Sequence, residues 1–351
     1  MTNPKNITLS NSEKLGLISN FATMLAAGIA ILEVVDSLLE DSKGNQKKIL
    51  EILREDLSQG NHMSTSFEKF PKVFDKITVN LIKASEEAGT LDVTLKDLKE
   101  TIKKDADFRD KIKGAVTYPA FVLVVFVGVL LMILIVVVPK ISSVFIRLKV
   151  PLPLPTQILI FASNLLVQDT IYVVPGILLF IAICALLWKS QKSAVANIVI
   201  GFPVISELVK EIDLTRFTRS LFLLLNAGIP ISNALELAQE VVVGSRVKAA
   251  ITHSKEMVVS GKKLSEGLKE AKDVFPSIMV KITEAGEKSG SLDKSMQDAS
   301  EFLDYQVSAT LRTFTALLEP LMLVIVGVLV GGMMLAIIAP IYGLIGQVGG
   351  H

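Results

Sequence analysis

Long uncharged stretches alternate with charged ones along this chain. No charged residue lies between Pro119 and Pro139 or between Thr170 and Trp188, and none follows Pro320. A helix of about 20 residues, rising about 1.5 Å per residue, crosses a hydrocarbon core about 30 Å thick. A buried helix of a soluble protein rarely stays apolar on every face for this length. The pattern therefore predicts three membrane-spanning helices.

The charged stretches have the periodicity of short amphipathic helices. Near the start, Leu15, Ile18, Phe21 and Leu25 recur at helical spacing, and Gly28 suits the left-handed residue that closes a helix. Similar apolar series follow, and the alternation typical of strands is absent. Each charged stretch is predicted to fold as a compact bundle of about six short helices.

The chain contains an internal repeat. Residues 25–31 recur at 225–231, an offset of 200, and the Gly28 turn recurs as Gly228. Further on, ASEEAGTLD from Ala84 matches AGEKSGSLD from Ala285, an offset of 201. Self-similarity of this kind indicates that one structural unit occurs twice.

A pair of prolines brackets a membrane span in each copy. Pro119 and Pro139 match Pro320 and Pro340, so all four mark span ends, and we expect Pro139 and Pro340 to end or kink helices near the outer surface. The soluble segment and its membrane helix were thus duplicated together. We predict an all-α membrane protein with two homologous six-helix bundles in the cytoplasm and three transmembrane helices.

Basic residues suggest the orientation in the membrane. Six Lys or Arg residues lie between 99 and 113, three lie between the first two spans, and none follows the third. Positive residues favour the cytoplasmic side, and we expect the N-terminus there because no apolar segment precedes Glu13. The expected order is bundle 1–117, span 118–139, extracytoplasmic loop 140–169, span 170–188, bundle 189–318, span 319–341 and extracytoplasmic tail 342–351.

Composition gives no support for catalysis. The net charge of +1 offers no basic face for nucleic acid, and the single cysteine, Cys184, excludes intrachain disulfides. The Gly261-Lys262-Lys263 segment lacks the spacing and the hydroxyl of a nucleotide-binding loop, and the three histidines are scattered. We therefore expect no enzyme activity, cofactor or metal.

Two acidic turns are the most informative segments. Glu86, Glu87 and Gly89 are echoed by Glu287 and Gly290. The glycines suit helix ends, but an acidic residue at the C-terminal end of a helix is disfavoured by the dipole. A purely structural role and an added contact with a partner or another subunit both remain open. We expect the turn around Glu287 to be exposed.

The membrane segments hold two weaker signals. Gly327 and Gly331 form a small-residue pair that would allow close helix approach. No Asp, Glu, Lys, Arg or His lies within the uncharged runs 119–139, 170–188 and 320–341, which argues against a proton relay. After Pro151, Pro153 and Pro155, an interfacial amphipathic helix is predicted to begin near Thr156.

In combination, these features resemble the F-type inner-membrane platform proteins of type II secretion systems and their equivalents in type IV pilus systems. The residues that carry the resemblance are the turn at 227–231 with Leu235 and Glu236, the segment 286–292, and Val138-Pro139-Lys140 followed by 152–156. The first copy departs from the pattern, with Ser85, Ala88 and Ala30 at matching positions.

The resemblance implies a non-enzymatic scaffold in the cytoplasmic (inner) membrane. Such proteins couple a hexameric cytoplasmic assembly ATPase to the polymerisation of pilin or pseudopilin subunits. Other inner-membrane assembly proteins, the lipid bilayer and further copies of the chain are the expected partners, with no direct contact to nucleic acid. We expect Glu287→Lys to impair assembly without unfolding. The alternative reading is a small multi-span transporter component that acts as an oligomer.

Overall fold

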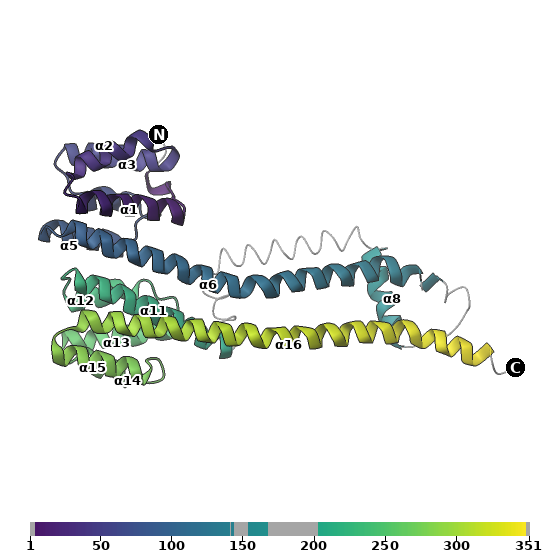
Figure 1. Cartoon of the computed structure of the whole chain (residues 1–351). Helices are drawn as coiled ribbons and strands as arrows, with labels where there is room; N and C mark the ends of the chain where they lie inside the picture. The colour runs from purple at the N-terminus through teal and green to yellow at the C-terminus, as the bar shows by residue number, and fades with distance from the viewer. Residues whose placement is uncertain (1–3, 141, 144–153, 168–202, 349–351) are drawn as a thin grey trace. The chain divides into compact units, whose positions relative to one another are not determined.

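The computed structural model describes residues 4–140, 142–143, 154–167 and 203–348. Within these ranges the protein is all-helical and contains no strand (Figure 1). The chain divides into two compact units. The first consists of Met1–Lys111 and Ser206–Ala309, and the second of Ile112–Ile205 and Thr310–His351. The predicted all-α class is thus confirmed.

The same succession of helices occurs twice in the first unit. After the short turn η1 (Pro4–Asn6), the first copy contains α1 (Asn11–Ala26), α2 (Ile31–Asp41), α3 (Gly44–Ser58), α4 (Met63–Glu68) and α5 (Lys76–Ala88). The second contains α11 (Pro203–Asn226), α12 (Ile231–Gln239), α13 (Ser245–Val259), α14 (Leu264–Glu270) and α15 (Ser277–Ser289). Both copies belong to one compact unit. Their separation into two bundles, with the predicted boundaries, stays a prediction.

Two core positions of this unit exchange their side chains between the copies. Leu17 and Phe21 are fully buried in α1, and at the matching positions of α11 Phe217 and Leu221 are fully buried. The leucine and the phenylalanine have exchanged places, so the total side-chain volume is the same. Volume-conserving exchanges of this kind are the ones that packed cores tolerate best.

The glycines expected to close helices have left-handed backbone angles. Gly28 and Gly228 have φ values of 80° and 77°, and Gly89 and Gly290 have values of 69° and 71°. After Gly89, the Thr90 amide donates to the Ser85 carbonyl at 2.9 Å. This bond spans six residues and satisfies a carbonyl that the end of the helix would otherwise leave unpaired.

Two long helices leave the first unit and continue into the second. They are α6 (Leu91–Met132) and α16 (Leu292–Val348). Helical segments Leu91–Lys140 and Leu292–Leu335 are long and apolar enough to cross a membrane. These are the first and third predicted spans. The second, 170–188, lies outside the described residues.

The helices do not end at three of the four prolines, and the place of these prolines at the edges of the spans stays a prediction. Pro119 lies inside α6, and both Pro320 and Pro340 lie inside α16. Each helix begins in the charged part of the chain, so the first proline of each pair falls in its middle. Because α16 continues to Val348, most of the predicted tail is also helical.

Pro139 follows a local widening of the helix. Residues Ile133–Val137 form a π-helical turn, η2, and the Val138 amide donates to the Ile133 carbonyl. In this pattern the Leu134 carbonyl would receive its bond from residue 139, but proline has no N–H. The matching residues 334–338 of α16 are regular α-helix.

A serine from another helix satisfies the carbonyl that Pro139 leaves without a donor. Helix α8 (Leu154–Val167) contacts η2, and the Ser163 hydroxyl donates to the Leu134 carbonyl at 2.6 Å. Ser163 is fully buried. A helix is therefore present where the sequence predicted one, near Thr156. Its interfacial position stays a prediction.

The predicted close approach at Gly327 and Gly331 is not observed among the described residues. A Cβ atom built on either glycine would have no further atom within 4 Å. Neither glycine is among the residues of α16 that line the groove between this helix and α6.

The Ser163 bond leads to a testable prediction. Ser163→Ala leaves the buried Leu134 carbonyl without a donor, which costs about 1–3 kcal/mol. We expect a lower melting temperature for the detergent-solubilised protein. Ser143→Ala is the control, because the exposed Ser143 hydroxyl bonds only to the nearby Lys140 carbonyl. Equal melting temperatures for both variants would show that the bond contributes nothing.

Candidate functional site

The Glu86 carboxylate caps a neighbouring helix. Glu86 lies in the last turn of α5, and its oxygens accept hydrogen bonds from the Met63 amide at 2.6 Å and from the Ser64 amide at 3.1 Å. The Ser64 hydroxyl donates a third bond at 2.6 Å. Met63 and Ser64 are the first residues of α4, whose free amides and positive dipole end favour a carboxylate.

Glu287 makes the same three contacts in the second copy. Its carboxylate accepts bonds from the Leu264 and Ser265 amides and from the Ser265 hydroxyl, at the start of α14. This arrangement explains why an acidic residue stands at the unfavourable end of a helix. The negative charge stabilises the N-terminus of the preceding short helix. This gain offsets the unfavourable interaction with the C-terminal end of the helix that carries the glutamate.

The expectation that the turn exposes Glu287 is therefore wrong for the carboxylate. Glu86 and Glu287 are half-buried and point inward, whereas Glu87, Gly89 and Gly290 are exposed. A partner that touched this turn would contact the exposed residues Glu87, Gly89 and Gly290. Their role in such a contact stays a prediction.

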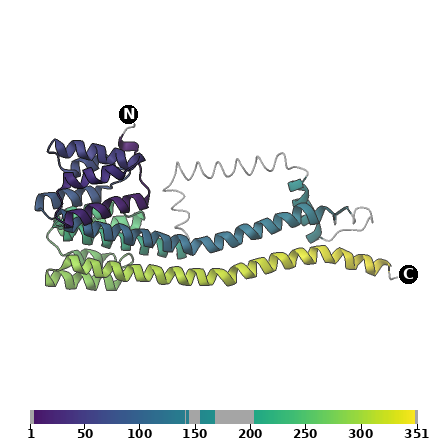
Figure 2. The same cartoon turned by 45° about the horizontal axis from the view of Figure 1, so that its top comes forward.

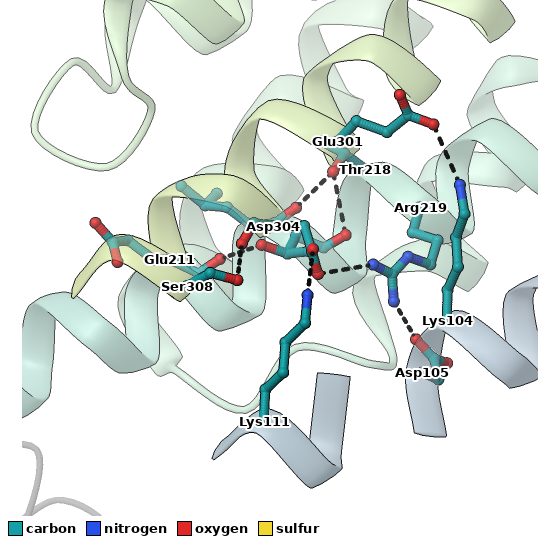
Figure 3. Close-up of polar contacts among 11 residues, drawn as sticks. Lys104, Asp105, Lys111, Glu211, Thr218, Arg219, Glu301, Asp304 and Ser308 are labelled. Carbon is teal, nitrogen blue, oxygen red and sulfur yellow. Dashed lines mark hydrogen bonds and ion pairs between the residues drawn. The ribbon is translucent and has the colours of Figure 1, made fainter. Parts of the chain in front are cut away.

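A buried arginine that the sequence analysis missed joins three long helices of the first unit. Arg219 projects from α11 and pairs with Asp105 of α6 and, at 3.4 Å, with Asp304 of α16 (Figure 3). Only 8% of its side chain is exposed. The guanidinium also lies over the Phe108 ring, 5.7 Å from its centre, a cation–π contact.

Two lysines of α6 extend this network towards α16. Lys111 pairs with Asp304 and Lys104 with Glu301, both at 3.2 Å. We call Lys104, Asp105, Lys111, Arg219, Glu301 and Asp304 the charged clamp. It lies next to the residues where α6 and α16 leave the first unit, Lys111 and Ala309. The clamp therefore holds the two long helices to α11 just before they enter the second unit.

The clamp occurs only once, although its helices occur twice. At the repeat-related positions, Ser19 stands for Arg219, Gln306 for Asp105 and Lys103 for Asp304. These three positions differ in chemistry between the copies, whereas Lys111 and Glu301 keep their charge as Arg312 and Glu100. The one available signal was a lone arginine among the buried apolar positions of α11.

Asp213 is a buried acidic residue whose partners are two backbone amides. Asp213 of α11 is almost fully buried and accepts bonds from the Val243 amide at 3.1 Å and the Gly244 amide at 2.6 Å. Burial raises the pKa of this carboxyl, and the two backbone bonds oppose that shift. These contacts fix the loop before α13. Among the described residues, no group of His, Cys, Asp and Glu is placed to hold a metal ion.

Comparison with known proteins places both copies in one family. The model of the family described as type II secretion system protein F matches residues 17–139 and 217–340, more than half of the chain. The chain belongs to this family. The two matched ranges begin in α1 and α11 and end at Pro139 and Pro340, so each family domain combines soluble helices with one apolar helix.

Relatives of the protein F family are found in pilus and secretion systems. The type IV pilus assembly protein PilC of Thermus thermophilus is 32% identical over 332 residues, covering 93% of this chain and 80% of the relative. PilC of Myxococcus xanthus is 29% identical, with coverages of 93% and 79%. Type II secretion system protein F of Vibrio cholerae is 28% identical, with coverages of 93% and 81%. The chain is thus a component of secretion or pilus machinery, and its two apolar helices support a place in the inner membrane.

The capping contact changes what a substitution at Glu287 should do. Glu287→Lys removes three hydrogen bonds and places a cation at the positive end of α14, so we expect loss of folding stability and a lower melting temperature. Glu87→Lys is the matched control, because Glu87 is exposed and the second copy already carries Lys288 there. A Glu287→Lys protein as stable as wild type would contradict the structural role.

Proposed function

We propose that this protein is a non-enzymatic platform of the inner membrane, which couples a cytoplasmic assembly ATPase to the polymerisation of pilin or pseudopilin subunits. The family match of both copies supports membership in such a machine. The names of relatives from both pilus and secretion systems support an assembly role. Other inner-membrane assembly proteins and further copies of the chain complete the proposed set of partners.

The observation that carries the coupling role is the continuity of α6 and α16. Each helix starts at a charged segment of the first unit and runs unbroken into an apolar segment (Figure 2). Because an α-helix is stiff along its axis, a displacement of its charged end is passed to its apolar end. The charged clamp ties both helices to α11, so a partner that moves the first unit moves both helices together.

Removing the exposed part of the clamp tests this role. Lys104→Gln with Lys111→Gln breaks both half-exposed ion pairs between α6 and α16. Half-exposed pairs contribute about 0–1 kcal/mol each, so the protein should fold. We expect normal amounts in the membrane but several-fold fewer pili, or less secreted protein, in a strain that lacks the native gene.

A control pair separates the clamp from loss of surface charge in general. Arg246→Gln with Lys288→Gln also removes two exposed, ion-paired cations from the first unit. This protein should support normal assembly. Equal assembly by the two double variants would argue against coupling through the clamp.

The proposed topology has three spans with the N-terminus and both charged segments in the cytoplasm. Gln59 and Ser260 are repeat-related and exposed, and they suit single-cysteine probes in a Cys184→Ser background. Both Gln59→Cys and Ser260→Cys should be protected from an impermeant thiol reagent in intact cells that have only a permeable outer membrane. They should react after the inner membrane is opened. Labelling of one but not the other in intact cells would place the two copies on opposite sides and overturn the topology.

A further inference from the structure

A polar pocket lies beside the charged clamp, inside the first unit. Its volume is about 290 Å³, and α6, α11 and α16 supply its walls. Lys104, Arg219 and Glu301 of the clamp form part of its lining (Figure 3). The pocket is therefore built from the same three long helices that the clamp joins.

Outside the clamp, the charged residues that line the pocket are mainly acidic. Asp97 of α6 accepts a hydrogen bond from the Asn226 side-chain amide at 2.7 Å. Within the described ranges, the side chains of Glu100, Asp293 and Lys294 form no hydrogen bond or ion pair. The ions of the clamp are already paired with one another. Three carboxylates and one ammonium remain, which give the pocket a net charge of −2.

Asp97 is in an environment that favours a nearby cation. Burial raises the pKa of this carboxyl, and the neighbouring Glu100 carboxylate raises it further. The hydrogen bond from Asn226 opposes both effects. A cation in the pocket would reduce the repulsion between the two carboxylates and would compensate for the loss of water around Asp97.

Ser300 adds a buried hydroxyl that has no partner. Ser300 lines the pocket, and only 5% of the residue is exposed. Its hydroxyl makes no hydrogen bond among the described residues. By contrast, the Ser308 hydroxyl, about two turns further along α16, donates to the Asp304 carbonyl at 2.9 Å. A buried hydroxyl without a partner is costly, and a hydrogen-bonding ligand in the pocket would remove that cost.

The pocket is longer than a single ion. Asp293 and Ser300 both line it from α16, and their positions in the sequence place them about 10 Å apart along the helix axis. Phe222 of α11 adds an aromatic side chain to the lining. A short alkyl chain with an amine at each end matches this length and this combination of carboxylates, hydroxyl and aromatic surface.

We propose that this pocket binds a linear aliphatic diamine in its doubly protonated form. One ammonium pairs with the free carboxylates, the alkyl chain lies against Phe222, and the second ammonium donates to the Ser300 hydroxyl. Two positive charges balance the net charge of −2. A metal ion fits less well, because in the part of the chain that the structure describes no group of His, Cys, Asp and Glu is placed to hold one. The inference does not depend on the proposed function.

The test uses the full chain in an uncharged detergent, with 1,4-diaminobutane as the probe. Calorimetric titration gives its dissociation constant and that of butylamine, which has the same alkyl chain but a single charge. Constant ionic strength separates binding from screening. We expect the diamine to bind about tenfold more tightly, the effect of about 1.4 kcal/mol from the second charge. It should also raise the melting temperature, because it binds the folded protein.

Two variants of α16 locate the site. Asp293→Asn removes a free carboxylate of the lining and should weaken diamine binding several-fold. Asp298→Asn is the matched control, because Asp298 is exposed on the same helix and does not line the pocket. Ser300→Ala should also weaken binding several-fold. It should not lower the melting temperature of the ligand-free protein, since the hydroxyl has no partner there to lose.

A gain of affinity keeps the test decisive where a carboxylate variant folds poorly. Lys294→Gln removes the free ammonium from the lining, so the diamine should bind several-fold more tightly. Misfolding cannot produce such a gain. Lys281→Gln is its control, because Lys281 is an exposed lysine of α15 outside the pocket, and its affinity should equal that of wild type.

Three results would overturn the inference. The first is equal affinity for the diamine and butylamine. The second is an affinity that Lys294→Gln leaves unchanged and that Asp293→Asn and Asp298→Asn lower equally, since binding would then follow the total charge of the protein. The third is displacement of the diamine by an equal concentration of Mg²⁺ or Ca²⁺, which would make an inorganic cation the ligand. Each would leave the proposed function standing, because pilus assembly or secretion is measured separately in cells.

Discussion

Backbone polar groups in hydrocarbon must find their partners within the protein, and this constraint governs both long helices. A helix satisfies them along its own length, so α6 and α16 cannot end where charge gives way to apolar sequence. Each proline inside a continuous helix then leaves one carbonyl without its usual N–H donor. At Pro139 the solution is a π-helical turn and a hydroxyl from Ser163, which fastens α8 to the first span. One missing N–H thus determines where a separate helix is attached.

In the first unit the same need is met by carboxylates. Glu86 and Glu287 accept hydrogen bonds from the first amides of α4 and α14, and Asp213 accepts them from the loop before α13. Helices this short have little stability of their own, so a cap from a neighbouring helix is part of what holds them. The conserved geometry of the two glutamates over an offset of 201 shows that this requirement survived duplication. Other buried polar groups did not. Asp56, Ser66 and Lys69 form a cluster whose counterparts are Met257, Gly267 and Glu270.

How far the sequence predicts the structure depends on the distance between interacting residues. The left-handed glycines and the repeated helices follow from spacing within a few residues, and both could be expected. The partners of Glu86 lie 22 and 23 residues away, so the acidic turn was recognised but its inward direction was not. Arg219 meets Asp105 across 114 positions, and no local pattern indicates that pairing. The sequence alone did not show that α6 continues through Pro119, because a proline's effect on a helix depends on what else can replace the lost hydrogen bond.

Duplication explains why the differences between the copies are more informative than their likeness. Two identical copies would present identical faces, and nothing would distinguish one end of the assembly from the other. The charged clamp breaks that equality in the first unit, since only α11 carries its arginine. In the second unit, Glu319 of α16 stands where α6 has Tyr118. The platform role proposed above, with subunits added in one direction, needs such asymmetry, and a few charged side chains on an otherwise repeated helical frame supply it.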